Sequence, residues 1–339
     1  MSGDLDTWAS SRGGWAEGLH PRDEVGKFSG TGGGAGSSTW RAVKTEPVPK
    51  REGKPGGGAG AQLPEGLRTR LKALGVSKLP AAHIGDVQVS DRVDDDENAH
   101  EGALLKWTDD HGNAQSSYSE EFDKQNAVAK WERVLRNRPV IEEALDDLRE
   151  KAAESPAHAA ALLIAETGLR PGSDDSLEAT GHYGATTMES RHVTFDDEAA
   201  SARIEYVGKA GKANVAEVSE PSLVAALRAH TEGKEPNDRV FDVSRAKVAA
   251  AAPEGVKLKD FRTSVATTLA EKELEGVTLR LTGNERTDAR AVLRVLKDVS
   301  TTVSKRLNNT PAMARKAYIA PQVIQAWAKR NGVNPAWVE

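Results

Sequence analysis

Apolar residues after position 123 recur at the spacing of amphipathic helices. In the stretch KQNAVAKWERVLRNR, four apolar side chains share one face of such a helix: Val128, Trp131, Val134 and Leu135. After Pro139 the chain is predicted to be mostly helical, through VIEEALDDLREKAAE and SPAHAAALLIAETGLR. Helical patterns resume at Ser222. The second half of the chain is therefore predicted to be mainly α-helical.

Alternating apolar and polar residues mark strands in two other regions. HIGDVQVS (83–90) and ALLKW (103–107) are predicted strands, DDHGN is a predicted hairpin turn, and NAQSSYS is the next strand. Between His192 and Ser219, the stretches HVTF, ARIEYVG and VAEVS alternate as a three-stranded antiparallel sheet does. The predicted fold class is α+β: a small mixed N-terminal domain, then a mainly helical domain that contains this sheet.

The first part of the chain differs in composition from the rest. Residues 1–61 are rich in glycine, serine and proline, as in SGTGGGAGSS and KPGGGAGAQ, and show no sustained periodicity. A segment of this kind is predicted to be a flexible tail. We therefore divide the sequence into this tail, a small α+β domain at residues 62–138, and a larger domain at residues 139–339.

Composition and charge narrow the classes of function. The sequence has 339 residues and no cysteine, which excludes disulfides, thiolate metal sites and a cysteine nucleophile. It has no apolar run long enough to span a bilayer and no signal-peptide pattern, so we expect a protein of the cytoplasm with no membrane partner.

The net charge of −5 disfavours nucleic acid as a partner, but the distribution of charge does not. Residues 91–150 hold 17 Asp and Glu against 8 Lys and Arg. Residues 257–330 hold 15 Lys and Arg against 7 Asp and Glu. Such a basic segment in an acidic chain fits a polyanion site.

Five polar residues in the second half attract attention, although each has a purely structural explanation. They are Arg170, Lys209, Arg262, Asn309 and Tyr318. Arg170 follows an apolar helix, Lys209 lies near a hairpin tip, and Arg262 fits the exposed face of a helix. Asp260 is the predicted N-terminal cap of that helix. Asn309 and Thr310 before a proline are typical of a helix N-cap. The structural explanation for Tyr318 is that its ring packs against neighbouring apolar side chains.

Together, two arginines, a lysine and a tyrosine are what phosphodiester transesterification requires. Attack on a DNA phosphate builds a doubly negative transition state, whose equatorial oxygens suit planar guanidinium groups. A tyrosine with a pKa of about 10 needs neighbouring cations to act as a nucleophile at neutral pH. The departing 5′ oxygen needs a proton, which a lysine of lowered pKa donates. Lys209 is the candidate for this general acid.

Five motifs surround these residues: TGLRPG, GHYGATTMESRHVTF, YVGKAGK, LKDFRT and NNTPAMARKAYIAP. In order and spacing, from about Thr167 to Pro321, they resemble the motifs of the type IB DNA topoisomerases, in the compact poxvirus-like and bacterial branch. A weaker similarity extends back to LPAAHIGDVQVS. The resemblance implies the DNA breaking-rejoining enzyme fold. It also implies that residues 139–339 are the catalytic domain and residues 62–138 a domain that clamps DNA.

The resemblance implies a catalytic role for each of the five residues. Tyr318 matches the nucleophile, which in this family forms a 3′-phosphotyrosyl bond while the freed strand rotates to relax supercoils. Arg170 and Arg262 match the two catalytic arginines, and Lys209 matches the general acid. Asn309 lies nine positions before Tyr318, where many members have histidine. Its amide donates a hydrogen bond but adds no charge, so we expect weakened catalysis, not its loss.

A duplex DNA partner implies further contacts. Tyr118 lies in AQSSYSEEF, where relatives tend to have a basic, aromatic stretch that contacts DNA. The other candidates for contacts with phosphate are Lys212, Lys259, Arg315 and Lys316. The neighbouring Glu120 and Glu121 predict binding that is weak or strongly dependent on salt. We expect a monomer that clamps duplex DNA and is associated with the nucleoid of a bacterial host.

No cofactor and no metal site is expected. The family requires neither ATP nor a metal ion. The lysine of GKPGGG precedes its glycines, so the order of residues is not that of a P-loop. The acidic run Asp94–Glu97 is typical of a solvated loop.

Two other functions stay open on the sequence. A tyrosine recombinase or integrase shares the catalytic fold and the TGLR string. Recombinases usually have His-x-x-Arg and Leu-Gly-His, however, where this chain has residues 259–262 and 307–309. The other alternative is a catalytically inactive DNA-binding phage protein. HPRDEVGKFSG (20–30) resembles a segment of phage structural proteins, which indicates a phage or prophage origin.

Overall fold

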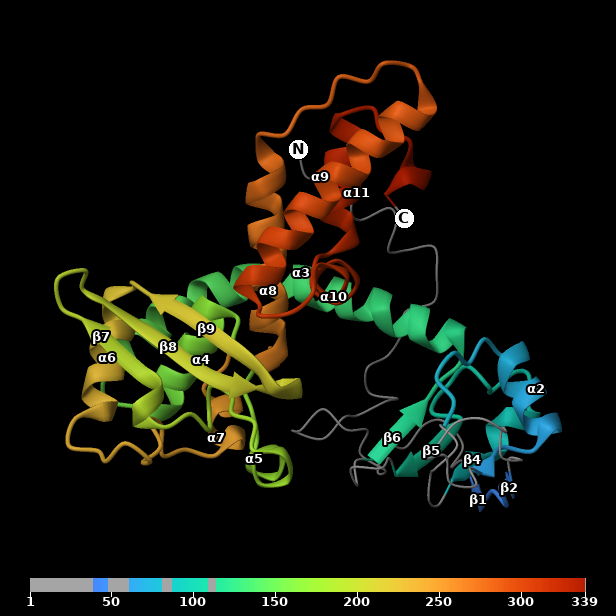
Figure 1. The fold of residues 1–339 in the computed structure, drawn as a ribbon, viewed down its shortest axis with the longest axis horizontal. Helices are drawn as coiled ribbons and strands as arrows, with labels where there is room; N and C mark the ends of the chain where they lie inside the picture. The colour runs from blue at the N-terminus through green and yellow to red at the C-terminus, as the bar shows by residue number, and fades with distance from the viewer. Residues whose placement is uncertain (1–38, 48–60, 81–86, 109–113, 339) are drawn as a thin grey trace, which may run out of the picture. The chain divides into compact units, whose positions relative to one another are not determined.

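The computed structural model describes residues 39–47, 61–80, 87–108 and 114–338 (Figure 1). The chain divides into two compact units, residues 1–132 and 133–339. The stretches HPRDEVGKFSG and DDHGN lie outside the described residues, as does most of the predicted tail. Among the helices that are described, none combines the length and the apolar character needed to cross a bilayer.

The described residues of the first unit form an antiparallel sheet in the order β1-β4-β5-β6 and a separate pair of strands, β2 and β3. Its elements are β1 (Trp40–Ala42), β2 (Glu46–Pro47), β3 (Ala61–Gln62), α2 (Glu65–Ala73), β4 (Gln88–Ser90), η2 (Asp91–Asp94), β5 (Leu105–Thr108) and β6 (Ala114–Ser117). In β5, Leu105 and Trp107 are buried while Lys106 is exposed, so the predicted alternation is confirmed there. Leu71 of α2 packs into the same core as Leu105.

The prediction of a flexible tail at residues 1–61 is wrong for residues 40–42 and 46–47, which form strands. Strand β1 pairs with β4, with Trp40 opposite Ser90. Asp91 accepts hydrogen bonds from the backbone N–H and the hydroxyl of Thr39, at 3.0 and 2.8 Å. The backbone bond from Thr39 is the main reason why the pKa of Asp91 lies below its ordinary value. Strands of two or three residues are too short for their alternation to be visible in a sequence rich in glycine.

The acidic run Asp94–Glu97 is bonded within the protein. Asp94 pairs with Arg41 at 2.9 Å and Asp96 with Arg70 at 2.5 Å. Asp95 accepts hydrogen bonds from the backbone N–H groups of the two residues that follow Asp96. These carboxylates therefore neutralise nearby arginines and close a turn.

Helix α3 (Glu120–Lys151) is one helix of 32 residues, although Pro139 stands inside it. The two units divide within this helix, at residues 132/133, whereas the sequence placed the boundary at 138/139. Pro139 is exposed and cannot donate to the carbonyl of Leu135, which is half-buried. Trp131 and Val134 are buried as predicted, but Val128 is 44% exposed.

The second unit contains the predicted helices and sheet. Its elements after α3 are α4 (Pro156–Thr167), α5 (Asp174–Thr180), η3 (Ser190–His192), β7 (Val193–Asp196), β8 (Ser201–Gly208), η4 (Lys209–Gly211), β9 (Lys212–Val218), α6 (Pro221–Thr231), α7 (Arg245–Ala250), α8 (Leu258–Glu275), α9 (Glu285–Arg306), α10 (Pro311–Ala317), α11 (Pro321–Arg330) and η5 (Pro335–Trp337). The three strands pair antiparallel in the order β7-β8-β9, which confirms the predicted sheet.

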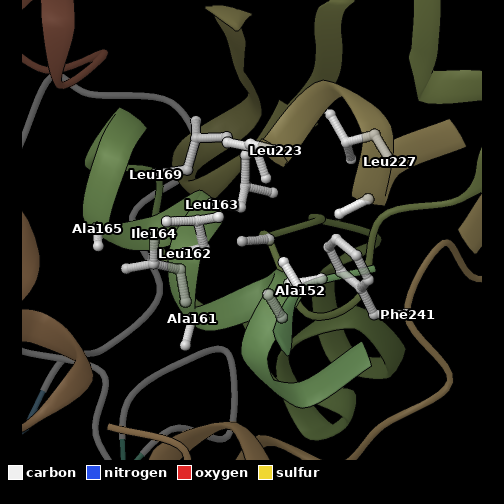
Figure 2. Close-up of a cluster of buried hydrophobic side chains, with 14 of the residues drawn as sticks. Ala152, Ala161, Leu162, Leu163, Ile164, Ala165, Leu169, Leu223, Leu227 and Phe241 are labelled. Carbon is white, nitrogen blue, oxygen red and sulfur yellow. The ribbon is translucent and has the colours of Figure 1, made fainter. Parts of the chain in front are cut away.

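Helix α4 lies at the centre of this unit. Its residues from Ala159 to Ala165 are buried, because the helix is apolar on every side. Leu163 lies in one cluster with Leu223 of α6 and with Phe241 (Figure 2). Helices α6, α7 and α8 and strand β9 all contact α4. The core therefore fixes the end of α4, where the TGLR string follows.

A buried ion pair holds the start of α8. Nη2 and Nε of Arg133 donate to the carboxylate of Asp260, at 3.0 and 3.1 Å. The Arg133 side chain is 12% exposed and that of Asp260 is 0% exposed. Asp260 also accepts a hydrogen bond from the backbone N–H of Lys257, at 3.1 Å. The N-cap of α8 is Lys257 and Asp260 is the third helical residue, so the predicted N-cap at Asp260 is wrong, although its carboxylate bonds the N-cap N–H.

We expect Asp260→Ala to lower the free energy of unfolding by about 3 kcal/mol, because it leaves a largely buried guanidinium without its carboxylate. The measurement is urea unfolding followed by circular dichroism. Asp146→Ala is the matched control, since Asp146 pairs with Arg149 on the exposed surface and such pairs contribute at most about 1 kcal/mol. Equal changes in the two variants would contradict a structural role for the buried pair.

Candidate active site

The side chains of Tyr318, Arg170 and Arg262 meet, although they belong to three distant segments of the chain. Nη1 of Arg170 donates a hydrogen bond to the Tyr318 hydroxyl, at 3.3 Å. The guanidinium carbon of Arg262 lies 4.9 Å from the centre of the Tyr318 ring. The structure thus brings together three of the five residues that the sequence singled out.

The loop that carries Arg170 is fixed by backbone contacts. Gly168 ends α4 with a left-handed φ of 68°, and a Cβ at this position would lie 2.7 Å from the Leu307 side chain. Such a position requires glycine. The carbonyl of Arg170 accepts a hydrogen bond from the backbone N–H of Ala185, at 2.8 Å. The TGLRPG and GHYGATT motifs therefore lie side by side, and their contact fixes the backbone at Arg170.

Arg262 is a buried cation on α8, only 2% exposed, so an exposed position on this helix is excluded. Its two Nη atoms donate to the backbone carbonyls of Gly168 and Leu307. Among the described residues, no carboxylate forms an ion pair with Arg262 or with Arg170. Burial lowers the pKa of Arg262, and the neighbouring Tyr318 partly offsets this effect. A buried guanidinium with neutral acceptors leaves positive charge available to an anion.

The two arginines determine the acidity of the Tyr318 hydroxyl. Burial is the largest single influence and by itself raises the pKa. The charges of Arg262 and Arg170, with their hydrogen bonds to the hydroxyl, outweigh burial. The pKa of Tyr318 is therefore below its ordinary value, which favours the phenolate that a nucleophile needs.

Helix α10 presents Tyr318 from its C-terminal end. Thr310 caps the helix by accepting a hydrogen bond from the backbone N–H of Met313, at 3.2 Å, and Pro311 is the first helical residue. This confirms the predicted cap. Thr267 of α8 donates its hydroxyl to the carbonyl of Tyr318, at 3.2 Å. The nucleophile candidate is therefore fixed by its own helix and by the helix that carries Arg262.

Asn309 lies in the turn between α9 and α10. Both polar atoms of its side chain are buried, and neither has a hydrogen-bond partner in the described part of the chain. Leaving such a group unsatisfied costs about 1–3 kcal/mol per lost partner. The amide therefore keeps an unused donor and an unused acceptor, and its predicted role toward phosphate stays a prediction.

Lys209 and Lys212 flank the turn between β8 and β9, and both side chains are exposed. In the described residues, no hydrogen bond or ion pair joins Lys209 to Tyr318 or to either arginine. The predicted hairpin position is confirmed. The role of Lys209 as general acid stays a prediction.

The remaining DNA-contact candidates have different surroundings. Lys259 and Lys316 are exposed, as phosphate-binding side chains must be. Arg315 is half-buried and donates to the carbonyl of Val338 at 3.0 Å, which gives it a structural role. Tyr118 belongs to the first unit and stacks on Phe122, with ring centres 4.9 Å apart. These predicted contacts with DNA remain predictions.

Two residues near the site were not among the site residues predicted from the sequence. Tyr206 of β8 is 4% exposed, and its hydroxyl has no hydrogen-bond partner among the described atoms. Burial raises its pKa, while Arg262 and Arg170 act in the opposite direction. The alternation of β8 was the available signal, because it turns Tyr206 inward. Asn308 has a left-handed backbone with φ 49°, which sequence does not reveal.

In the described ranges, no three histidine or carboxylate side chains are placed to hold a metal ion. The groups at the Tyr318 hydroxyl are instead cationic, so they suit an anion.

Two comparisons with known proteins bear on this site. Residues 119–332, more than half of the chain, match the family model described as eukaryotic DNA topoisomerase I, catalytic core. The match begins at α3 and includes every residue placed in the site. The search of curated proteins gave no match.

We expect Arg170→Gln to raise the pKa of Tyr318, because the variant removes a positive charge and leaves burial unchanged. The measurement is the pH titration of tyrosinate absorbance, with Tyr318→Phe subtracted to isolate this one phenol. Arg191→Gln is the matched control, since Arg191 donates to a different tyrosine hydroxyl, that of Tyr183. A Tyr318 titration that is the same in Arg170→Gln and wild type would contradict the electrostatic explanation.

Proposed function

The chain belongs to the family of the eukaryotic DNA topoisomerase I catalytic core, and from this premise we propose that it relaxes supercoiled duplex DNA by cutting and rejoining one strand. The nucleophile of the proposed reaction is Tyr318. The family is that of the type IB topoisomerases, so DNA is the partner.

One observation carries the proposal: two guanidinium groups act on the hydroxyl of Tyr318 and have no carboxylate partner among the described residues. A phosphodiester provides the anion that such groups lack. Its transition state gains negative charge on the equatorial oxygens, and planar guanidinium groups stabilise that charge through paired hydrogen bonds. The same groups lower the pKa of the attacking phenol.

In the proposed reaction, Tyr318 Oη attacks the phosphorus of one DNA phosphodiester and loses its proton to solvent. A bond forms between Oη and phosphorus, and the bond between phosphorus and the 5′ oxygen breaks. Lys209 supplies a proton to the 5′ oxygen, which departs as a hydroxyl group. The 3′-phosphotyrosyl bond keeps the energy of the original phosphodiester.

Religation reverses these steps after the freed strand has rotated. The 5′ hydroxyl attacks the phosphotyrosine, and Tyr318 departs. Solvent takes the proton of Tyr318, Lys209 supplies the proton of the leaving group, and the two arginines stabilise the negative charge, so the proposed scheme uses no metal ion or nucleotide.

Binding is proposed to involve one protein molecule and duplex DNA. Residues 62–138 would clamp the duplex, with Tyr118 against the DNA backbone. Residues 139–339, the catalytic domain, would cut and rejoin the strand. Lys212, Lys259 and Lys316 would bind phosphates, an arrangement that their exposure supports. The poxvirus-like and bacterial branch, a phage or prophage origin and action at the bacterial nucleoid complete the proposal.

Asn309 is proposed to donate a hydrogen bond to a non-bridging oxygen of the phosphate. We expect Asn309→Ala to slow DNA cleavage by about tenfold. This factor corresponds to roughly 1.4 kcal/mol, near the lower end of what a hydrogen bond to a charged group contributes. Cleavage rates under single-turnover conditions measure this. Asn237→Ala, at an exposed asparagine, is the control that should keep the wild-type rate. Equal rates for both variants would remove Asn309 from the site.

The central experiment traps the protein on supercoiled plasmid with denaturant, in the absence of ATP and magnesium. We expect wild type to relax the plasmid and to become covalently attached to DNA, and Tyr318→Phe to do neither, because it lacks the nucleophilic oxygen. Tyr183→Phe is the matched control, since the hydroxyl that it removes donates to Glu189, which is not a residue of the site. Relaxation of arbitrary plasmids excludes a recombinase that depends on paired sites. A wild-type protein that never attaches to DNA would defeat the enzymatic proposal.

A further inference from the structure

Asn308 combines an unusual backbone conformation with an unusual contact. Its φ of 49° lies in the left-handed region, which asparagine and glycine adopt with the least strain. Its side-chain amide binds both backbone groups of one residue in strand β9. Oδ1 accepts from the N–H of Val215 at 3.3 Å, and Nδ2 donates to the carbonyl of Val215 at 3.2 Å. The amide thus takes the place of a neighbouring strand.

This contact lies close to the hairpin that carries Lys209. Val215 is three residues beyond Lys212, and Lys212 pairs with Gly208 across the hairpin. In the described sheet, β9 is an outer strand, so its outward backbone groups depend on a partner such as Asn308. On the β8 side, the backbone N–H of Tyr183 bonds the carbonyl of Val207, at 2.9 Å. The base of the hairpin tip is therefore held from both sides.

The other end of the Asn308 contact belongs to the segment that leads to Tyr318. Its neighbour Leu307 ends α9 and accepts a hydrogen bond from Arg262. Thr310 begins α10, whose last turn presents Tyr318. Tyr318 itself has separate anchors, to α10 through its N–H and to Thr267 through its carbonyl. Loss of the Asn308 amide leaves these two anchors in place but removes both hydrogen bonds to the outer edge of β9, so it should displace the hairpin more than it displaces Tyr318.

We propose that Asn308 is a positioning residue, which fixes the hairpin of Lys209 relative to Tyr318 by bonding Val215. This inference deepens the proposed function and rests on it, because it assigns Asn308 to the step in which Lys209 protonates the 5′ oxygen. The left-handed φ aims the amide at β9, and the paired hydrogen bonds resist sliding of the strand. The structure in this way joins the general acid and the nucleophile through one side chain.

The leaving group offers a way to isolate this step. An alkoxide is a poor leaving group and needs the proton that Lys209 supplies. A thiol has a pKa of about 8.5, so a sulfur at the same position departs as thiolate without a general acid. DNA with a bridging 5′ sulfur at the cleavage site therefore removes the need for Lys209 but leaves attack by Tyr318 unchanged.

The test compares single-turnover cleavage of ordinary and 5′-sulfur DNA by wild type, Lys209→Ala and Asn308→Gly. Glycine keeps the left-handed backbone and removes only the amide. We expect Asn308→Gly to slow cleavage of ordinary DNA by roughly tenfold, part of the 10²–10⁴-fold that general acid catalysis contributes. On 5′-sulfur DNA we expect the wild-type rate, as for Lys209→Ala.

The double variant provides a second readout. If Asn308 acts through Lys209, adding Asn308→Gly to Lys209→Ala slows ordinary DNA no further. Independent, multiplying effects would overturn the inference. Asn308→Asp, which keeps the acceptor and loses the donor, replaces the glycine variant should thermal unfolding show that the glycine variant does not fold.

The remaining outcomes are decisive as well. Equal slowing on both substrates would show that Asn308 acts on the nucleophile or on the fold, and no slowing on either would show that it has no role in the reaction. Both results overturn this inference and leave the proposed function standing. A wild-type protein that cleaves neither substrate would overturn the proposed function and this inference with it.

Discussion

The buried guanidinium group of Arg262 joins three segments that are far apart in the sequence. It extends from α8, bonds the carbonyl at the end of α4 and bonds the carbonyl at the end of α9. Taking a charge out of water costs several kcal/mol unless it is well bonded, so these two carbonyls are structural necessities as much as the core is. The core around α4 and the buried Arg133–Asp260 pair hold the helix ends in place for this arrangement.

The site is electropositive because, within the described residues, Arg262 has no carboxylate partner. The helix ends offer neutral carbonyls to Arg262. Burial and the charge of Arg170 lower its pKa, and the phenol of Tyr318 partly offsets this effect. The charge of Arg262, with the charge of Arg170, decides the acidity of Tyr318 against the opposing effect of burial. The acidic balance of the whole chain is therefore a poor guide to its site, where local charge has the opposite sign.

The sheet contributes to the site at its edges. Strand β8 turns Tyr206 toward the two arginines, and the turn after it exposes Lys209. Strand β9 offers its outer backbone groups to Asn308, next to the residue that Arg262 bonds. Backbone groups at helix ends and at a strand edge thus connect the elements of the site.

Local patterns in the sequence predicted the helix of residues 156–167, the three-stranded sheet and the cap at Thr310, because each depends mainly on nearby residues. They also predicted which residue types suit phosphodiester chemistry, from the intrinsic chemistry of tyrosine, arginine and lysine. The sequence did not reveal the strand at residues 40–42, since a short strand forms only when a distant partner such as β4 pairs with it. Nor did it reveal that a helix continues through Pro139, since a proline inside a helix usually kinks or ends it. Only the tertiary structure decided that Arg262 is buried, that it meets Arg170 at Tyr318, and that Asn308 binds β9. These properties depend on distances between residues up to 148 positions apart, which no local pattern contains.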